Sequence, residues 1–215
     1  MMLFKALKGS LRQTRDRWLL QVLYWPRVIR HHLRADRPKR LHVGCGNNSF
    51  AGWINADITP KAELIIFMER RLPFPGASLS RIYSEHVLEH VPYEVGAGFL
   101  REAFRVLEAG GVIRLAVPDL RELAEGYLRG DWRTRFDWTQ WPDYAFLKTG
   151  AQMLNVGFRW WGHQHLYDRE ELQRALEEAG FSEISFPAFR ESALEDLRDL
   201  ETRLDSRLIA EAVKR

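Results

Sequence analysis

The sequence has 215 residues, of which 46% are hydrophobic and 28% are charged. A chain of this size and composition buries enough apolar surface for one globular domain, which excludes disordered and fibrous proteins. Its single cysteine, Cys45, excludes an intramolecular disulfide and a thiolate-bound metal cluster. No apolar run approaches the roughly 20 residues that span a bilayer, and the N-terminus lacks the pattern of a signal peptide. We therefore expect a cytoplasmic protein.

Positive charge is concentrated in the first 40 residues. They contain 11 Lys or Arg residues and two acidic residues, whereas acidic residues outnumber basic ones in the rest of the chain. We interpret residues 1–38 as a basic amphipathic N-terminal arm, because Phe4, Leu7 and Leu11 would share one face of a helix. The arm either packs on its own domain or docks on an anionic membrane surface or a partner protein. We expect no nucleic-acid binding, because no RNA-binding motif accompanies the charge.

From residue 39 to residue 215, apolar segments of strand and helix character alternate. Such alternation predicts an α/β fold with a mostly parallel sheet and right-handed crossovers. Asp168 and Gly180 are suited to cap the helix that we expect between them. The predicted strands cover residues 40–43, 54–57, 64–67, 81–84, 112–117, 184–186 and 208–213, and the predicted helices cover residues 93–107, 168–179 and 192–204.

A stretch rich in aromatic residues interrupts this alternation. Residues 131–162 contain five of the eight tryptophans. The stretch is longer than the usual connection between a strand and a helix, so we interpret it as an insertion in the domain formed by residues 39–215. Its rings could form a small satellite core, or a lid whose exposed faces stack on a sugar or another planar group.

The first predicted strand runs into Gly44, Cys45 and Gly46, at the carboxyl edge of the predicted sheet. Open α/β sheets bind ligands at this edge, and glycines let a ligand approach the backbone closely. A dinucleotide-binding loop would have a third glycine three residues later, but Ser49 stands there. Asp57 ends the next predicted strand, where a carboxylate can accept hydrogen bonds from both hydroxyls of a ribose.

Four segments then follow one another in a recognisable order. They read LHVGCGNN, INADI, LPFPGASLSRIYSEHVLEHV and LREAFRVLEAGGVIRLAVPDL. They resemble the successive motifs of class I S-adenosylmethionine-dependent methyltransferases, and the resemblance extends over residues 40–213. Two later segments, GHQHLYDREELQRALEEAGF and DLETRLDSRLIAEAVK, are similar to a bacterial subgroup associated with surface-polysaccharide biosynthesis. The resemblance implies a Rossmann-like sheet, mostly parallel with an antiparallel last strand and helices on both faces, and S-adenosylmethionine as cofactor.

The resemblance also implies which residues bind this cofactor. Gly44 and Gly46 would leave room for its methionine and ribose, with Cys45 and Asn47 beside them in the same loop. Asp57 would hold the ribose hydroxyls. Residues at the end of the fourth predicted strand would line the sulfonium and the acceptor side, namely Ser84, Glu85 and His86.

The chain departs from the family pattern at two places. Only ten residues separate Gly46 from Asp57, too few for a full crossover helix and a strand, so an abbreviated turn or a single helical turn should connect them. The family usually carries an acid before LPF that meets the adenine amino group, but this chain reads IFMERRLPF. Glu69 is the nearest substitute, and a backbone carbonyl near Met68 is the alternative.

Methyl transfer from a sulfonium is an in-line displacement that depends on alignment and requires no metal ion. A hydroxyl acceptor also benefits from a base that takes its proton, and histidine has a suitable pKa near neutral pH. We predict His86, Asp119 and His163 as catalytic candidates. His90 and His165 lie at the same predicted edge. Asp119 could instead cap the following helix, and His163 could pin the insertion by hydrogen bonding.

His86 and His90 are four residues apart, a spacing that can place two metal ligands on one helix face. No further ligands follow at a suitable spacing, so we predict no metal site. The sequence places no base beside Cys45 either. We therefore expect its thiol to pack against the glycines and not to act as a nucleophile.

Together these features predict an enzyme that transfers a methyl group from S-adenosylmethionine to an acceptor. The subgroup resemblance, the aromatic stretch and the basic arm favour a hydroxyl of a glycan or glycolipid precursor, at the inner face of the membrane. One alternative is a small-molecule methyltransferase of the same fold. The other is a non-catalytic cofactor-binding scaffold that docks to glycan-assembly enzymes.

Overall fold

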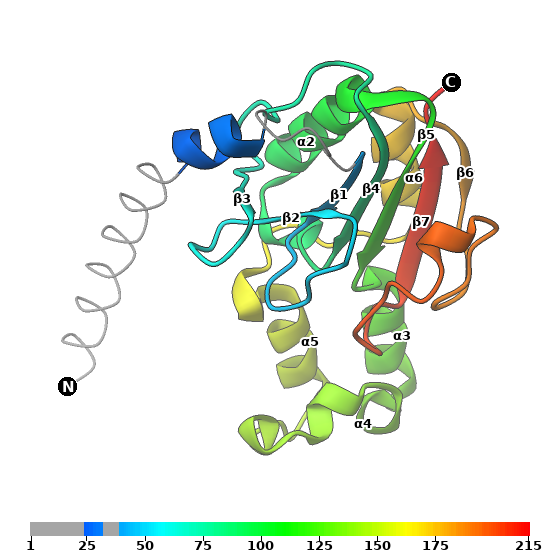
Figure 1. The fold of residues 1–215 in the computed structure, drawn as a ribbon. Coiled ribbons are helices and arrows are strands. Elements are labelled where there is room, and N and C mark those ends of the chain that lie inside the picture. Colours follow the sequence, from blue (N-terminus) through cyan, green and yellow to red (C-terminus); the bar gives the residue numbers. More distant parts are fainter. Residues whose placement is uncertain (1–23, 32–38) are drawn as a thin grey trace.

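The computed structural model describes residues 24–31 and 39–215 of the chain, which contain a seven-stranded sheet with helices packed against it (Figure 1). The strand order is β3-β2-β1-β4-β5-β7-β6. The strands are β1 (Arg40–Val43), β2 (Ile54–Asp57), β3 (Leu64–Ile65), β4 (Leu79–Glu85), β5 (Leu107–Val117), β6 (Ser182–Ser185) and β7 (Leu208–Val213).

The five strands from β3 to β5 in this order run parallel, and β7 runs antiparallel to both of its neighbours. This arrangement confirms the predicted fold class, a mostly parallel sheet with an antiparallel last strand. The chain moves from β1 to β2 and β3, and then crosses to β4 on the other side of β1. The carboxyl ends of β1 and β4 therefore flank the point where the strand order reverses, which is where open α/β sheets bind ligands.

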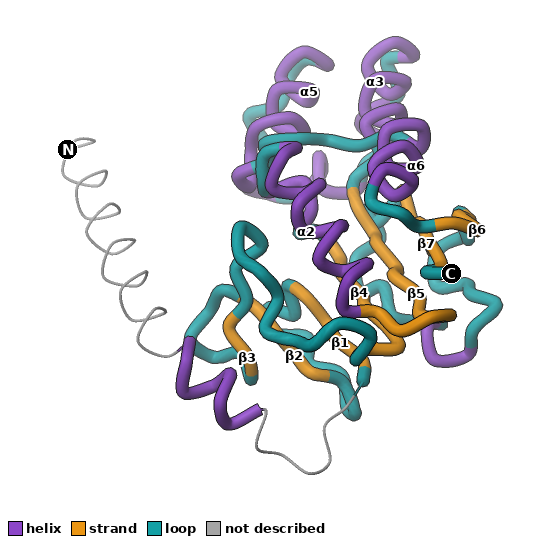
Figure 2. Tube along the Cα trace, turned by 90° about the horizontal axis from the view of Figure 1, so that it is seen from above, coloured by secondary structure: helices purple, strands orange, loops and turns teal. Residues whose placement is uncertain are grey.

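The helices fall into two groups. Two of them, α2 (Tyr93–Val106) and α6 (Arg169–Glu178), lie along one face of the sheet (Figure 2). The second group follows β5 and comprises α3 (Leu120–Arg129), α4 (Trp132–Arg135), α5 (Gly150–Arg159) and the 3₁₀ turns η2 (Asp137–Gln140), η3 (Pro142–Tyr144) and η4 (Trp160–Gly162). Two further 3₁₀ turns are η1 (Leu88–His90), after β4, and η5 (Glu195–Leu197), before β7.

The main core lies between the sheet and the first group of helices. Alternate residues of a strand point to the same face, so Ile82 of β4 and Leu115 of β5 share one buried cluster with Phe99 of α2 and Leu172 of α6. Burial of each such side chain contributes about 1.5–3 kcal/mol to folding. This core fixes the strands whose carboxyl ends carry the candidate site.

Most predicted elements are present, with shifts at their ends. β1, β2 and β7 have the predicted bounds. Asp168 caps α6 as predicted, and its carboxylate accepts a hydrogen bond of 2.9 Å from the Glu171 backbone N–H. β5 is longer than predicted, because it begins directly after α2 at Leu107 and includes the glycine pair before residue 112. β3 is shorter than predicted, and β6 begins two residues earlier.

Loops cover most of the second face of the sheet. The β1–β2 connection contains turns and no helix, in agreement with the short spacing in the sequence. Asn55 stabilises it, because its side chain accepts a hydrogen bond from the Phe50 N–H at 2.8 Å and donates one to the Phe50 carbonyl at 3.0 Å. Trp53, Tyr83 and Leu197 form a buried cluster on this face, with Phe50 packed against it.

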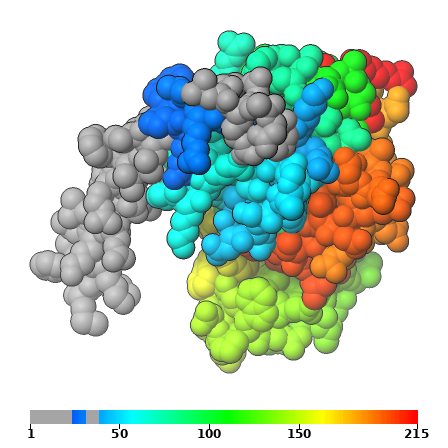
Figure 3. Space-filling model, viewed as in Figure 1, coloured from blue at the N-terminus to red at the C-terminus, as the bar shows by residue number. Residues whose placement is uncertain are grey.

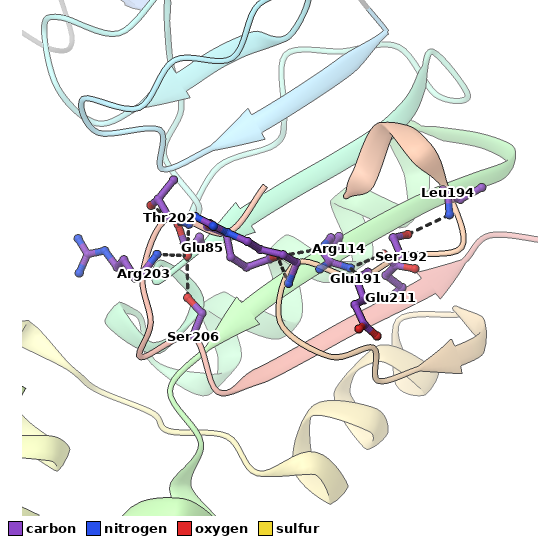
Figure 4. Close-up of polar contacts among 11 residues, drawn as sticks. Glu85, Arg114, Glu191, Ser192, Leu194, Thr202, Arg203, Ser206 and Glu211 are labelled. Carbon is purple, nitrogen blue, oxygen red and sulfur yellow. Dashed lines mark hydrogen bonds and ion pairs between the residues drawn. The ribbon is translucent and has the colours of Figure 1, made fainter. Parts of the chain in front are cut away.

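The predicted helix over residues 192–204 is wrong. Only η5 is helical there, and the rest of residues 186–207, which we call the β6–β7 segment, crosses the second face as irregular chain (Figure 1). The fully buried Arg114 of β5 explains the difference. Its guanidinium donates to the Glu201 carboxylate at 2.6 Å. It also donates to the Glu191 carbonyl at 2.9 Å (Figure 4). In a helix, residues ten apart would be separated by about 15 Å, too far for one guanidinium to reach both.

Residues 24–31 form a helix beside β3 (Figure 1). Tyr24 and Val28 are buried in the main core cluster, whereas Trp25 and Ile29 are exposed. This part of the predicted arm therefore packs on its own domain, and the rest of the arm lies outside the described residues. Within the described ranges, no helix has the length and apolar character needed to cross a membrane.

The aromatic insertion, residues 131–162, folds into short helices and turns beyond the carboxyl edge of the sheet (Figure 1). Part of it is a satellite core, in which Trp132, Phe136, Trp138 and Tyr144 are buried together. The insertion therefore contains both a buried core and solvent-exposed aromatic rings. The exposed rings are Trp141, Phe146, Phe158, Trp160 and Trp161.

We expect Glu201→Gln to destabilise the fold, because it removes the charge of a fully buried carboxylate that lies 2.6 Å from the Arg114 guanidinium. Removing one partner of a buried ion pair costs about 3–5 kcal/mol, and Glu211 remains as a second carboxylate, so the expected loss is about 3 kcal/mol. The free energy of unfolding is measured by urea denaturation. Glu195→Gln, at an exposed position of η5, is the control and should change it by less than about 0.5 kcal/mol. A loss below about 1 kcal/mol for Glu201→Gln would contradict this role of the ion pair.

Candidate active site

The glycine loop, residues 44–48, follows β1 at the carboxyl edge of the sheet. Gly44 and Gly46 both have positive φ angles, of 76° and 53°. A Cβ atom on Gly44 would lie 2.0 Å from the Val87 side chain, so this glycine makes room for the turn after β4. A Cβ atom on Gly46 would meet nothing within 4 Å. Of the two, Gly46 leaves open space for a ligand, and packing accounts for Gly44.

Cys45 and Asn47 differ in exposure although they share this loop. The Cys45 side chain is buried, and burial together with the charge of Asp57 raises the pKa of its thiol to about 11. The thiol is therefore protonated near neutral pH, which fits a packing role and not a nucleophile. Asn47 is exposed.

Asp57 ends β2 next to the glycine loop, as the sequence predicts. Its Oδ2 accepts a hydrogen bond from the Gly46 N–H at 2.8 Å, and its Oδ1 accepts one from the Thr59 N–H at 3.1 Å. These bonds fix the carboxylate at the edge of the sheet. A carboxylate has about four acceptor positions, so both oxygens can still accept hydrogen bonds from a ligand. The open cradle at Gly46 and this carboxylate together fit a ribose.

Two other predicted cofactor contacts, Ser84 and Glu69, differ in burial. The Ser84 hydroxyl, at the end of β4, is buried and has no hydrogen-bond partner within the described part of the chain. Glu69 is exposed in the turn after β3. Its contact with an adenine stays a prediction, as does the alternative contact through a carbonyl near Met68.

Glu85 anchors the β6–β7 segment. Its carboxylate accepts hydrogen bonds from the Thr202 N–H and hydroxyl, the Arg203 N–H and the Ser206 hydroxyl, at 2.6–3.1 Å (Figure 4). Burial raises the pKa of this carboxyl, but these donors outweigh burial and lower it, so the group is ionised. Asn48 also donates to the Thr202 hydroxyl, which ties the segment to the glycine loop. This anchoring role could not be predicted from the sequence, because the partners are more than a hundred residues away.

A pocket opens between the turn after β4, the aromatic insertion and the end of the β6–β7 segment. We call it the edge pocket. Figure 3 shows the β6–β7 segment in orange and red directly against the insertion in yellow-green. The Arg207 guanidinium donates to the Arg135 carbonyl across this contact. The residues that line the edge pocket include His86, Asp119, Trp161, His163, Arg203 and Asp205.

His86 is the predicted catalytic residue with the most distinctive setting. It has a φ angle of +52°, which is uncommon for a residue other than glycine and which occurs often at functional sites. Its Nδ1 lies 3.0 Å from Oε1 of the fully buried Glu89, and its Nε2 lies 3.7 Å from Asp205 Oδ1. Burial lowers the pKa of this imidazole, but the hydrogen bond and charge of Glu89 outweigh burial and raise it.

Asp119 caps a helix and also lines the edge pocket, and its catalytic role stays a prediction. Its carboxylate caps α3 by accepting a hydrogen bond from the Arg121 N–H at 2.8 Å. It also lines the edge pocket, and burial raises the pKa of its carboxyl. Since Oδ1 already serves the cap, we regard Asp119 as a residue that shapes the pocket wall.

The two histidines at the end of the insertion separate in space. His163 lines the edge pocket, and its Nδ1 lies 2.8 Å from the Gly157 carbonyl, so it also pins the insertion. Burial lowers the pKa of this imidazole. His165 instead lies with its Nε2 3.3 Å from Glu171 and is not part of the pocket lining.

Sequence reasoning missed one group of residues here. Glu89, His90 and His163 place one possible metal-ligand atom each within 4.8 Å of one another. From the sequence, His86 and His90 were considered as a pair of possible ligands. No third ligand was recognised, because His163 follows His90 by 73 residues. The adjacent Glu89 and His90 were the available signal in the sequence for such a group.

Residues 26–185 match the sequence profile of the methyltransferase domain family. The match covers well over half of the chain, so the chain belongs to this family of enzymes. Together with the fold, this membership identifies an S-adenosylmethionine-dependent methyltransferase. The search of curated proteins finds no match to the sequence.

Methyltransferases are among the solved structures that resemble this one. One, an S-adenosylmethionine-dependent methyltransferase from Archaeoglobus fulgidus, is 16% identical, has a TM-score of 0.50 and matches over 96% of this chain and 99% of its own. Another, from Thermotoga maritima, is also 16% identical, has a TM-score of 0.49 and matches over 97% of both chains. At these identities the similarity concerns the fold alone.

Proposed function

We propose that this enzyme methylates a hydroxyl group of a glycan or glycolipid precursor, with His86 as the base that takes the hydroxyl proton. One observation carries the proposal. The buried His86 ring lines the edge pocket, and its Nε2 has no hydrogen-bond partner among residues 24–31 and 39–215. A hydroxyl bound in the pocket would supply that partner.

The cofactor would lie along the carboxyl edge. Bound S-adenosylmethionine supplies an electrophilic methyl group on its sulfonium. Gly46 leaves the backbone open to the cofactor, and Asp57 is suited to accept hydrogen bonds from its ribose hydroxyls. Because β1 and β4 are neighbours in the sheet, the glycine loop after β1 adjoins His86, which follows β4. The cofactor and the acceptor would thus meet where the strand order reverses.

His86 would take the acceptor proton on Nε2 as the new carbon–oxygen bond forms and the carbon–sulfur bond breaks. Glu89 holds the opposite ring nitrogen at 3.0 Å, which fixes the ring orientation. Its negative charge would stabilise the imidazolium that forms. The remaining rate enhancement would come from alignment of the two reactants in a pocket with limited access to water.

The pocket walls favour an acceptor that has both apolar faces and hydroxyl groups. Trp141 and Trp161 line the pocket and are about half exposed. Such rings stack well on the C–H face of a sugar. Arg203 and Asp205 on the opposite wall offer a hydrogen-bond donor and an acceptor for its hydroxyls. This combination supports a sugar over a purely apolar small molecule.

The basic character of residues 1–38 supports a lipid-linked acceptor, because clustered Lys and Arg residues attract anionic membrane surfaces. Trp25 and Ile29 present exposed apolar surface at the end of this arm. The enzyme would then act as a peripheral protein at the inner face of the membrane.

The cofactor contact is tested by calorimetric titration of S-adenosylhomocysteine into the wild-type protein and into Asp57→Ala. We expect micromolar binding to the wild type and at least tenfold weaker binding to the variant, about 1.4 kcal/mol, because the ribose loses its carboxylate acceptor. Asp143→Ala, at an exposed position of η3, is the matched control and should bind like the wild type. Equal affinity in Asp57→Ala would contradict the ribose contact.

The base is tested with His86→Asn. Asparagine tolerates the positive φ angle and can still donate a hydrogen bond to Glu89, but it cannot take a proton. We expect methyl transfer to fall by about 10² or more, with S-adenosylhomocysteine affinity unchanged. The measurement is transfer of radiolabel from the cofactor into extracted bacterial glycolipids.

Three results would count against this reading. Wild-type label that enters only water-soluble small molecules would favour a small-molecule methyltransferase. An absence of label from every pool, with cofactor binding intact, would favour a scaffold. An undiminished rate in His86→Asn would remove His86 as the base.

A further inference from the structure

Three side chains gather next to His86, and two of them, His90 and His163, line the edge pocket. Glu89 and His90 belong to η1, and His163 follows η4 at the end of the aromatic insertion. Their candidate ligand atoms all lie within 4.8 Å of one another. The rings of His90 and His163 are 5.0 Å apart, in an edge-to-face arrangement.

The Glu89 carboxylate is fully buried and only partly satisfied. Its Oε1 lies 3.0 Å from His86 Nδ1 and 3.9 Å from His90 Nε2. Its Oε2 has no hydrogen-bond partner in the described ranges of the chain. A buried carboxylate oxygen without a hydrogen-bond donor is energetically unfavourable. A bound cation would remove this cost.

His163 is held as metal-binding histidines usually are. A carbonyl oxygen can only accept a hydrogen bond, so the contact of 2.8 Å with Gly157 places the ring proton on Nδ1. The lone pair is then on Nε2, which is free to coordinate a metal. Such a second hydrogen bond, from the other ring nitrogen to a carbonyl, typically orients a histidine ligand.

Hydrogen bonds to backbone carbonyls hold the segments that carry the three residues together. The N–H groups of Gln164 and His165 both donate to the Glu89 carbonyl, at 2.8 Å and 3.2 Å. The Gln164 side chain also donates to the His90 carbonyl at 2.6 Å. The end of the insertion is therefore tied directly to η1, so the three candidate ligands are held near one another before any ion binds.

We propose that Glu89, His90 and His163 bind one divalent first-row transition metal ion at the wall of the edge pocket. Two imidazoles and one carboxylate suit such ions, and three protein ligands leave coordination positions open. Ligand atoms about 2.0–2.2 Å from a metal lie about 3–3.5 Å from one another, so the widest separation in the cluster must close by roughly 1.5 Å. His90, about one third exposed, has the freedom to move by this amount.

The open positions face the pocket in which the acceptor would bind. This role of the ion toward the acceptor rests on the proposed function. A metal ion there would bind an acceptor oxygen as a Lewis acid and make its hydroxyl more acidic, while His86 receives the proton. An acceptor with two neighbouring oxygens, such as a sugar diol, would chelate the ion. The site would thus select polyhydroxyl acceptors.

The test is titration of Co²⁺ into the full-length protein after removal of metals with a chelator, followed by calorimetry and by visible absorption of the bound ion. We expect one equivalent to bind with micromolar or better affinity. His163→Ala and His90→Ala should each weaken binding at least tenfold, about 1.4 kcal/mol. His165→Ala is the matched control, since His165 lies two residues away but outside the cluster, and it should bind like the wild type.

Two outcomes would overturn the metal site. One is a wild type that binds no Co²⁺ below millimolar concentration, and the other is equal binding by the wild type, His90→Ala and His163→Ala. Glu89→Gln, which keeps the shape of the side chain, serves as an additional variant with expected weak binding should an alanine variant fail to fold. Folding of every variant is checked by thermal unfolding.

Titration of S-adenosylhomocysteine into the same samples separates the two proposals. A protein that binds this cofactor product but no Co²⁺ refutes the metal site alone. A protein that binds Co²⁺ through His90 and His163 but no S-adenosylhomocysteine supports the metal site and refutes the proposed function.

Discussion

The buried guanidinium of Arg114 is the constraint on which much of the architecture depends. The short β1–β2 and β2–β3 connections leave the second face of the sheet without crossover helices, so another part of the chain must cover it. Arg114 holds the β6–β7 segment on that face through Glu201, and Glu85 fixes the following turn at the carboxyl edge. The same segment then supplies Arg203 and Asp205 to the edge pocket. One buried charge thereby links the cover of the sheet to the shape of the site.

Glu89 has a comparable position within the site. Its carboxylate contacts His86, and its carbonyl receives the backbone N–H groups of Gln164 and His165. The turn after β4 and the end of the aromatic insertion are therefore fixed to each other through a single residue. A proton acceptor and a set of metal ligands on one wall would cooperate, because both would act on the same bound oxygen.

Local sequence pattern was sufficient to predict the sheet and the position of Asp57 at the end of β2. Short apolar runs predict strands, and the carboxyl ends of parallel strands all lie at one edge of the sheet. The failure at residues 192–204 has a different cause. Their apolar spacing suggests a helix, but the conformation is decided by Arg114, about 90 residues away in the sequence. The approach of His163 to Glu89 depends in the same way on how the insertion returns to the sheet.

The most direct test of the central claim is a crystal structure of the protein with S-adenosylhomocysteine. The geometry described above predicts that both ribose hydroxyls are within hydrogen-bond distance of the Asp57 carboxylate and that the sulfur atom faces the edge pocket on the side of His86. A ribose bound away from Asp57, or a sulfur atom separated from the edge pocket by the β6–β7 segment, would contradict the assignment of cofactor and acceptor to this edge of the sheet.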